Sequence, residues 1–234
     1  MKYDPPLIRA VLIRRYKRFL ADVTLEDGRE VVAHCANPGA MTGLAQAGTI
    51  VWLEPNDDPK RKLRYSWKLA EIDGALIGID TALPNKVVGA ALRAGQVPSL
   101  AGYNTVRAEV KYGENSRVDF LLTAEGLPDC YVEVKSANLC RKAGLVEFPD
   151  TVTTRGAKHM AELAAMVAQG HRAVVLYLVQ RTDCSAFAVA RDIDESYGMA
   201  FSAALGAGVE ALCHRAILSL EGASFGEALP IVAE

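Results

Sequence analysis

The spacing of the apolar residues changes once along the chain, and this change limits the folds that the chain can adopt. Up to residue 82, apolar runs of strand length alternate with turn signals, whereas longer elements follow Pro84. Short runs between turns are typical of an all-β unit, and strands alternating with helical patterns are typical of an α/β unit. At 234 residues the chain is long enough for two small domains. We therefore expect one domain over residues 1–83 and a second over residues 84–234.

The first domain is predicted to be an OB-like β-barrel. Asp27-Gly28 and Asp73-Gly74 are dipeptides favoured in two-residue hairpin turns, where positive φ is required. The segment 37–44 interrupts the β pattern after the third strand, where a five-stranded OB barrel carries its extra helix. The strands are expected at residues 7–14, 19–25, 30–35, 49–53 and 65–79, the last broken by a turn.

The second domain reads as αβββαβ, so the fold class of the chain is α/β (α+β). Pro84 and a polar residue open the first helix, and period-two alternation marks the strands. A further helix at 193–205 and a hairpin around Glu221-Gly222 complete the chain. The elements in order are a helix at 85–94, strands at 105–111, 117–122 and 130–135, a helix at 153–169 and a strand at 173–179.

Three charged residues interrupt two neighbouring apolar strands. Asp119 lies in the strand 117–122, and Glu133 and Lys135 share one face of the strand 130–135. If the two strands are adjacent, Asp119 lies across from Glu133, with Lys135 just beyond. Two carboxylates and an ammonium group would then converge at one point of the sheet.

This trio suits metal-assisted hydrolysis of a phosphodiester. Mg²⁺ is held in proteins by one or two carboxylates together with substrate phosphates and water, and Mn²⁺ accepts the same oxygen ligands. We expect Asp119 and Glu133 to be the metal ligands and Lys135 to orient or activate the attacking water. The alternative is structural: Asp119 pairs with Lys135, and Glu133 lies on a polar sheet face.

The helix at 153–169 adds a polar stripe. Arg155, Lys158, His159 and Glu162 fall at i, i+3, i+4 and i+7, opposite an apolar stripe. Arg155 and Lys158 are candidates for contacts with a nucleic-acid backbone, and His159 is a candidate catalytic residue that transfers a proton or orients water. A solvent-facing stripe without function is the competing interpretation.

Basic residues gather in two segments of the first domain that contain no acid. Residues 7–20 carry five bases and residues 60–68 another five, with aromatic residues interleaved. Cations displace condensed counterions and rings stack on unpaired bases, so this pattern favours nucleic acid; a solvated face is the plainer alternative. The candidate nucleic-acid-binding residues of these segments are Arg14, Arg15, Lys17, Arg18, Arg64 and Trp67.

Composition narrows the cellular setting. The five cysteines are odd in number and form no C-x-x-C pair, so they read as reduced thiols. No window approaches the run of about 18 apolar residues that a membrane span needs, and the N-terminus lacks the apolar core of a signal peptide. We expect a cytoplasmic protein with no membrane partner. The net charge of −2 decides nothing about nucleic acid, because a local patch matters more than the sum.

Four separated blocks resemble a known family. The αβββαβ order with D…E-x-K is similar to the PD-(D/E)xK nuclease superfamily, and the whole chain resembles the sugar fermentation stimulation protein family. The blocks are HCANPGAM at 34–41, RVDFLL at 117–122, VEVKS at 132–136 and FPDTVTTRGAKH at 148–159. Alanine and proline stand at positions 36 and 38, where we would expect proline and threonine.

The resemblance implies an N-terminal OB-like domain, a nuclease-like C-terminal domain and DNA binding without sequence specificity. Three functions remain open. The first is a Mg²⁺-dependent nuclease; the second is a non-catalytic DNA-binding regulator of sugar metabolism, of the maltose type, that keeps the nuclease fold. The third is a small-molecule sensor or scaffold that binds no nucleic acid. The sequence does not separate DNA from RNA, or single from double strands, and leaves the oligomeric state open.

Overall fold

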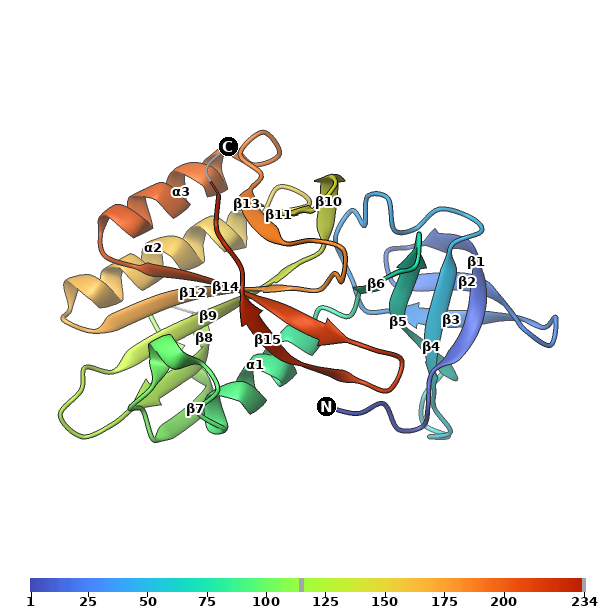
Figure 1. Ribbon diagram of the computed structural model, residues 1–234, viewed down its shortest axis with the longest axis horizontal. Coiled ribbons are helices and arrows are strands. Elements are labelled where there is room, and N and C mark those ends of the chain that lie inside the picture. The colour runs from blue at the N-terminus through green and yellow to red at the C-terminus, as the bar shows by residue number, and fades with distance from the viewer. Residues whose placement is uncertain (114–115, 233–234) are drawn as a thin grey trace.

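The N-terminal domain is a closed barrel of five strands with a sixth appended. In the computed structural model, which describes residues 1–113 and 116–232, the strands are β1 (Ile8–Tyr16), β2 (Leu20–Leu25), β3 (Glu30–Cys35), β4 (Ile50–Pro55), β5 (Tyr65–Ile72) and β6 (Ala75–Gly78). β1 pairs with both β2 and β4, and β3 closes the barrel through a parallel pairing with β5 (Figure 1). The predicted OB-like barrel is confirmed.

Two connections of the barrel differ from the prediction. The β2–β3 turn is a four-residue connection with only Gly28 at positive φ, whereas Asp73 and Gly74 form the expected two-residue turn with φ of 51° and 79°. The segment between β3 and β4 forms no helix; all its residues are described. Pro38 and two glycines disfavour a helix there, and Asn37 holds the segment instead by donating from Nδ2 to the carbonyl of Ile79 at 3.0 Å.

The C-terminal domain is a mixed sheet with helices on both faces. The sheet order is β15-β14-β12-β9-β8-β7, with β12 parallel to β9 and β14. Its elements are α1 (Leu83–Arg93), a 3₁₀ turn (Pro98–Leu100), β7 (Thr105–Tyr112), β8 (Ser116–Thr123), β9 (Cys130–Ala137), β10 (Leu139–Lys142), β11 (Leu145–Phe148), α2 (Thr154–Ala168), β12 (Arg172–Val179), β13 (Ala186–Val189), α3 (Glu195–Gly206), β14 (Glu210–Leu218) and β15 (Ala223–Ala228).

The predicted αβββαβ order is present, with additions that the sequence analysis missed. Along the chain, β10 and β11 lie between β9 and α2, and β13 lies between β12 and α3. These three short strands form a separate sheet. Strands of four residues are too short to show a period. α1 begins at Leu83, one residue before the predicted domain division, which stays a prediction.

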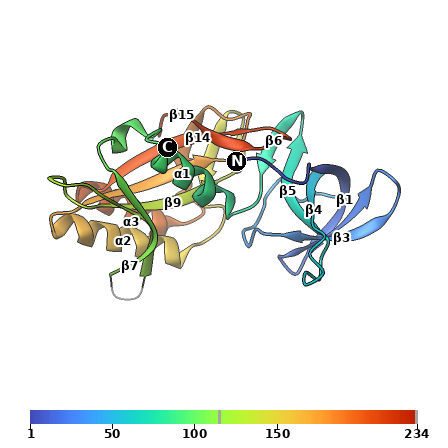
Figure 2. The same cartoon turned by 90° about the horizontal axis from the view of Figure 1, so that it is seen from below.

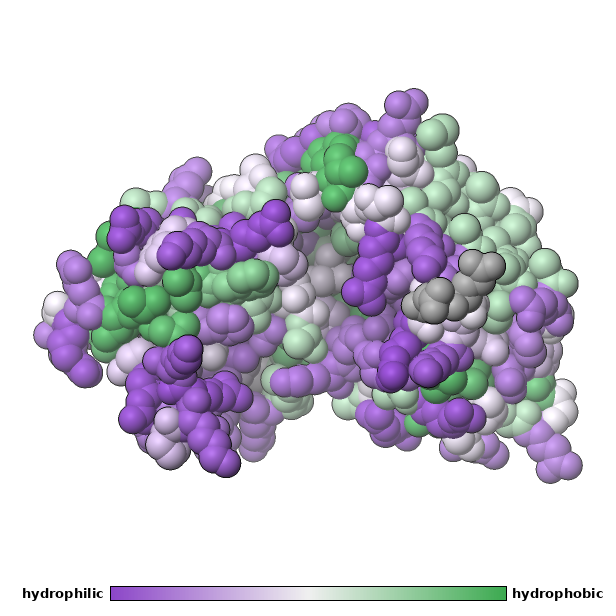
Figure 3. All heavy atoms as spheres, turned by 180° about the vertical axis from the view of Figure 1, so that it is seen from behind, coloured by the Kyte–Doolittle hydropathy of each residue, from purple (hydrophilic) through white to green (hydrophobic). Residues whose placement is uncertain are grey.

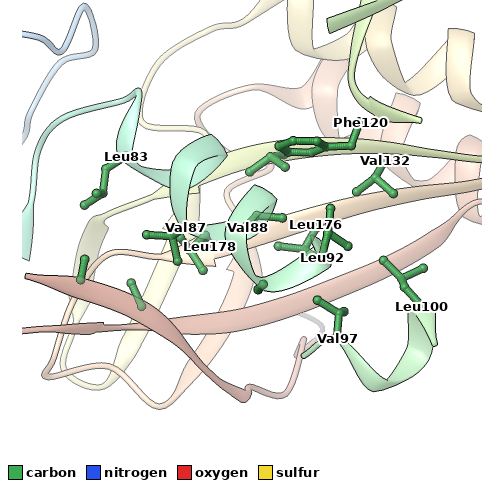
Figure 4. Packing of buried hydrophobic residues seen from close by; sticks show 14 of the residues in the cluster. Leu83, Val87, Val88, Leu92, Val97, Leu100, Phe120, Val132, Leu176 and Leu178 are labelled. Carbon is green, nitrogen blue, oxygen red and sulfur yellow. The ribbon is translucent and has the colours of Figure 1, made fainter. Parts of the chain in front are cut away.

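Each face of the main sheet has its own apolar core. α1 packs its apolar side onto one face, where Val88 and Leu92 point toward Phe120 and Leu176 (Figure 4). α2 and α3 cover the other face, as Figure 1 shows. The central strand β12 is buried almost throughout, as expected for a strand covered on both faces. None of the helices in the described residues is long and apolar enough to cross a membrane.

Within the part of the chain that the structure describes, main-chain hydrogen bonds join the two domains at two places. The N–H of Gly78, at the end of β6, donates to the carbonyl of Gln180 at 2.9 Å. The N-terminal residues leave the barrel and lie beside the β14–β15 hairpin (Figure 2), where the N–H of Tyr3 donates to the carbonyl of Glu221 at 2.9 Å. These bonds fix the barrel against the end of β12 and the turn of the β14–β15 hairpin.

Candidate catalytic and cation-binding site

The site forms where β8 and β9 separate. Their antiparallel pairing ends at Phe120↔Val132, so Asp119, the residue before Phe120 in β8, has no ladder partner in β9. Its carboxylate takes the place of that partner, because Oδ2 accepts a hydrogen bond from the N–H of Val134 at 2.7 Å. The carboxylate of Asp119 is thereby fixed next to the Glu133 position.

The same point breaks the alternation of β8. Val118 packs in the core under α2, whereas Phe120 packs in the core under α1, although residues two apart in a regular strand share one face. Opposite Asp119, Glu109 of β7 has a left-handed φ of 56°, and the β7–β8 pairing skips this position. Irregular pairing of this kind lets one side chain be aimed away from the regular pleat.

Glu133, Lys135 and His159 form a buried cluster beside Asp119. The ammonium group of Lys135 donates to Oε1 of Glu133 at 2.7 Å, and Nδ1 of His159 is hydrogen-bonded to the same oxygen. The side chains of Glu133, Lys135 and His159 are only 4%, 11% and 5% exposed. Helix α2, which begins after its N-cap Thr153, positions His159 over β9.

Arg155 extends this cluster toward the surface. Its Nε donates to Nε2 of His159 at 3.2 Å, one helical turn along α2. Nε2 is therefore the acceptor of the ring, and Nδ1 is the donor toward Glu133. Because Nδ1 carries the proton, the 3.2 Å approach of Lys135 to that atom is a contact and not a hydrogen bond.

The two carboxylates have opposite pKa shifts. Burial, followed by the negative charge of Glu133, raises the pKa of Asp119 to about 6, against the bonds from Val134 and Asn85. Burial alone would raise the pKa of Glu133 as well, but the hydrogen bond from His159 and the charge of Lys135 outweigh it, and its pKa lies below the usual value. The pair thus resembles other sites where environment separates two carboxylates.

The donor set fits a hard divalent cation. Oε2 of Glu133 is buried and has no hydrogen-bond partner among the described residues, so one carboxylate oxygen remains for a ligand. Asp119 and Glu133 supply two carboxylates, and no group of three or more His, Cys, Asp or Glu suited to a metal occurs in residues 1–113 and 116–232. Mg²⁺ and Mn²⁺ accept two carboxylates, with water and phosphate completing the shell.

Asn85 is a site residue that the sequence analysis missed. Its Nδ2 donates to Oδ1 of Asp119 at 2.6 Å, so α1 fixes the second oxygen of that carboxylate. The signal available was weak: an amide in the first turn of a helix that is apolar on its buried side. An amide there is equally typical of an ordinary helix start.

Two of the predicted nucleic-acid contacts are engaged within the barrel. Arg14 pairs with Asp22 at 2.7 Å and lies over the ring of Tyr16, 5.0 Å from its centre. Arg15 is turned inward: Nη2 donates to the carbonyl of Asn37 at 2.7 Å and to that of Gly39 at 3.1 Å, and Nε donates to Arg18. The Arg15 side chain therefore holds the β3–β4 loop.

The remaining basic residues among the predicted contacts are exposed. Lys17 and Arg18 form the β1–β2 turn with φ of 48° and 63°, and both are exposed. Arg64 is 57% exposed and only 3.9 Å from Asp57, and Lys158 is 52% exposed, 3.5 Å from its helix neighbour Glu162. These four cations are available to a polyanion; of the predicted contacts on α2, Arg155 is the one that touches the buried cluster.

Trp67 is a core residue, and its prediction as a base-stacking surface is wrong. The side chain is fully buried inside the barrel, and its Nε1 donates to the carbonyl of Leu69 at 2.8 Å. Alternation along β5 turns it inward, away from the basic residues beside it in sequence. Among the aromatic residues of the two basic segments, Phe19 is 45% exposed and offers a ring face.

Comparisons with known proteins agree with this architecture. Residues 13–79 match the family model of the SfsA N-terminal OB domain, and residues 82–222 match that of the sugar fermentation stimulation protein RE domain. A sugar fermentation stimulation protein homolog of Dinoroseobacter shibae is 61% identical over 233 residues, covering 99% of this chain and 96% of that protein. One of Ruegeria pomeroyi is 59% identical, covering 98% and 100%.

A solved structure is similar over the whole chain. Pyrococcus furiosus SfsA, determined in complex with Ca²⁺, superposes with a TM-score of 0.88 at 28% identity and covers 100% of both chains. The two family models together span both domains, and the identity to several relatives exceeds one half. This chain therefore belongs to the sugar fermentation stimulation protein (SfsA) family.

Proposed function

We propose that this protein is a divalent-cation-dependent nuclease that holds nucleic acid on its basic barrel. The observation that carries the proposal is the convergence of Asp119 and Glu133 with Lys135 and His159 at one buried point. Two carboxylates at the end of paired strands, beside an ammonium group, match what phosphodiester hydrolysis requires. The Ca²⁺ in the structure of the P. furiosus protein supports a cation site in this family.

Asp119 and Glu133 would hold Mg²⁺ or Mn²⁺. When bound, such an ion stabilises negative charge on the phosphate and lowers the pKa of water. The hydrogen bonds of Val134 and Asn85 to Asp119 hold its carboxylate in one orientation before any ligand arrives. This preorganisation lowers the cost of assembling the cation site.

Lys135 and His159 have different roles around Glu133. Lys135 brings a positive charge to the buried site, where it stabilises an anionic phosphate and orients the attacking water. His159 donates through Nδ1 to Glu133 and accepts through Nε2 from Arg155, so it is a positioning residue for the carboxylate. This assignment revises the prediction that His159 is catalytic. Arg155 remains partly free to contact a phosphate oxygen.

In this proposal the barrel makes the sequence-nonspecific contacts with nucleic acid. Lys17, Arg18 and Phe19 are neighbours in the exposed β1–β2 turn, and Arg64 ends the β4–β5 loop. In Figure 3, strongly hydrophilic side chains gather at the lower end of the barrel, which lies at the left in that view. Loops of OB barrels commonly contact oligonucleotides, and phosphate contacts by such residues make affinity fall with salt.

The test is incubation of labelled single- and double-stranded DNA and RNA with the wild type and Lys135→Met, in Mg²⁺, Mn²⁺ or EDTA. We expect cation-dependent cleavage that Lys135→Met reduces by about 10² or more, with binding largely kept. Lys111→Met, an exposed lysine of β7, is the matched control and should cleave like the wild type.

A second candidate is a DNA-binding regulator that keeps the fold without turnover. The observation in its favour is that Lys135 and His159 already occupy Oε1 of Glu133, so half of that carboxylate is satisfied internally. It predicts salt-sensitive binding without cleavage under every condition of the same assay. Absence of both binding and cleavage would contradict both candidates and favour a sensor or scaffold.

A further inference from the structure

We infer that the pocket between the barrel and the sheet domain binds one unpaired nucleobase, next to the phosphate held at the Asp119–Glu133 site. This inference rests on the proposed function and names its substrate class: single-stranded nucleic acid, or a duplex from which one nucleotide is turned out. The pocket has a volume of about 270 Å³. That is close to the lower end of small-molecule sites and far larger than one water needs.

The pocket and the candidate catalytic cluster are built on the same two elements, β9 and α2. Ser136 lines the pocket and follows Lys135 in β9, so the two Cα atoms are about 3.8 Å apart. Thr153 lines it as well and caps α2, the helix that carries Arg155 and His159 into the cluster. A nucleotide whose phosphate lies at the cluster has this pocket within reach of its base. A hollow between the two lobes is visible in Figure 3.

The walls of the pocket come from both domains and are held in place without a ligand. The barrel wall is the loop at Asn37 and Gly39, whose carbonyls accept from the Arg15 guanidinium at 2.7 and 3.1 Å. The opposite wall contains Asp150, whose Oδ2 accepts from the N–H of Met41 at 3.3 Å. A Cβ at Gly39 would lie 2.3 Å from that oxygen, so glycine permits this close approach. A preformed pocket costs little ordering on binding.

The lining suits an uncharged planar ring and not a phosphate. No Lys or Arg lines the pocket among the residues that the structure describes. Phe148 and two prolines supply flat apolar surface, and asparagine, serine and threonine side chains supply neutral polar groups. Glu147 is neutralised by Arg141, which donates to both of its oxygens at 2.5 and 2.9 Å. Apolar walls with a few placed polar groups are the usual make-up of a small-molecule site.

Asp150 adds a preference among the bases. Its carboxylate is an acceptor, and adenine, cytosine and guanine each carry an exocyclic amino group that can donate to it. Thymine presents carbonyl oxygens and one imide N–H, so it gains less. A base that is stacked and paired in a duplex cannot enter an enclosed pocket, so the base must be unpaired to enter.

The test uses short single strands that carry 2-aminopurine, titrated with the full chain in Ca²⁺, a cation that accepts carboxylate and phosphate oxygens, with strand length checked by gel after each titration. Fluorescence anisotropy gives the affinity, and the 2-aminopurine signal reports transfer of the base into a pocket. We expect the single strand to bind about tenfold more tightly than the duplex of the same sequence. An abasic site scanned along the strand should remove this gain at one position.

Two variants localise the effect. Thr151 lines the pocket and is exposed, so Thr151→Trp fills the space without touching a core; it should remove the tenfold preference and the 2-aminopurine signal, while the salt dependence stays. Thr105→Trp, exposed on β7, is the matched control. Asp150→Asn keeps an oxygen for the N–H of Met41 and should weaken the preference of adenine over thymine.

The outcomes separate this inference from the proposed function. Equal affinity for single strand and duplex, unchanged by Thr151→Trp, would overturn the base pocket and leave the nuclease proposal standing. A single-strand preference that survives Thr151→Trp would also overturn it. If neither DNA nor RNA shows salt-sensitive binding, the proposed function is wrong, and the pocket assignment that rests on it is wrong as well.

Discussion

Arg15→Ala separates a structural arginine from those available to nucleic acid. In sequence, Arg15 is one of five bases within residues 7–20 and is predicted to contact phosphate. In the structure it donates three hydrogen bonds to carbonyls: to Asn37 at 2.7 Å, to Gly39 at 3.1 Å and to Arg18 at 3.0 Å. Its removal should therefore weaken the barrel and the pocket wall, and leave the salt dependence of binding unchanged.

The magnitude follows from the hydrogen bonds that the substitution removes. The two bonds of Nη2 are partly buried and the third is exposed. At about 1 kcal/mol for each partly buried bond, and little for the exposed one, the free energy of unfolding falls by about 2 kcal/mol. For a protein of this size that lowers the melting temperature by about 4–8 °C. Urea unfolding followed by circular dichroism measures the first, and a thermal scan the second.

Arg14→Ala and Lys17→Ala are the matched controls. Arg14 is 68% exposed, so its removal should change stability little. Lys17→Ala should lower the slope of log affinity against log salt by about 0.7–0.9 for each phosphate that the lysine neutralises in the wild type. If Arg15→Ala were as stable as the wild type, or if it lowered that slope, the structural role assigned to Arg15 would be wrong.

Three further predictions concern the site, the core and the N-terminus. Because the pKa of Asp119 is raised, the folded state without cation, in EDTA, keeps a proton that the unfolded state has lost. The free energy of unfolding should therefore fall by on the order of 1 kcal/mol from pH 5 to 7. Asp119→Asn should remove this fall, which urea titrations at several pH values measure. Tyr177→Phe leaves the buried hydroxyl of Tyr197 without its 2.5 Å partner and should cost about 1–3 kcal/mol in the same assay. Gly222→Ala places a Cβ 2.1 Å from the carbonyl of Met1 and should free the N-terminal segment, measured as faster amide exchange there.

Each of these has a control that keeps it testable. A pH dependence that persists in Asp119→Asn would assign the effect to other groups. Adding Tyr197→Phe to Tyr177→Phe should recover part of the stability, because no buried hydroxyl is then left unpaired. Gly206→Ala, where a Cβ would meet nothing within 4 Å, should leave amide exchange unchanged; equal protection of residues 1–3 in the Gly222→Ala variant would contradict the docking.

Much of the fold could be predicted because the periodicity of the apolar residues and the residue types in the turns indicated the same elements. The Asp73-Gly74 turn and the alternation in the strands of the barrel specify their own local structure. The closure of β3 onto β5 depends on long-range pairing, which no local pattern encodes. Strands β10, β11 and β13 escaped prediction because four residues carry too little periodicity.

The site was predictable in its residue types and not in its connections. Asp119, Glu133 and Lys135 were visible as charges that interrupt apolar strands. The contact of His159 with Glu133 depends on where α2 lies over β9, and that of Asn85 on where α1 lies over β8. Trp67 was wrongly predicted to contact nucleic acid because it lies among basic residues in sequence, whereas those neighbours point to the opposite side of the strand.

The measurement that tests the cation site most directly is a Mn²⁺ titration followed by electron paramagnetic resonance, on the folded wild type and Glu133→Gln. Glutamine keeps the shape of the buried side chain and removes its charge. We predict saturable binding to the wild type, strongly weakened in Glu133→Gln and in Asp119→Asn, with cation-dependent cleavage of DNA abolished in parallel. Mn²⁺ binding that is unchanged in both folded variants would contradict the assignment of these carboxylates as cation ligands.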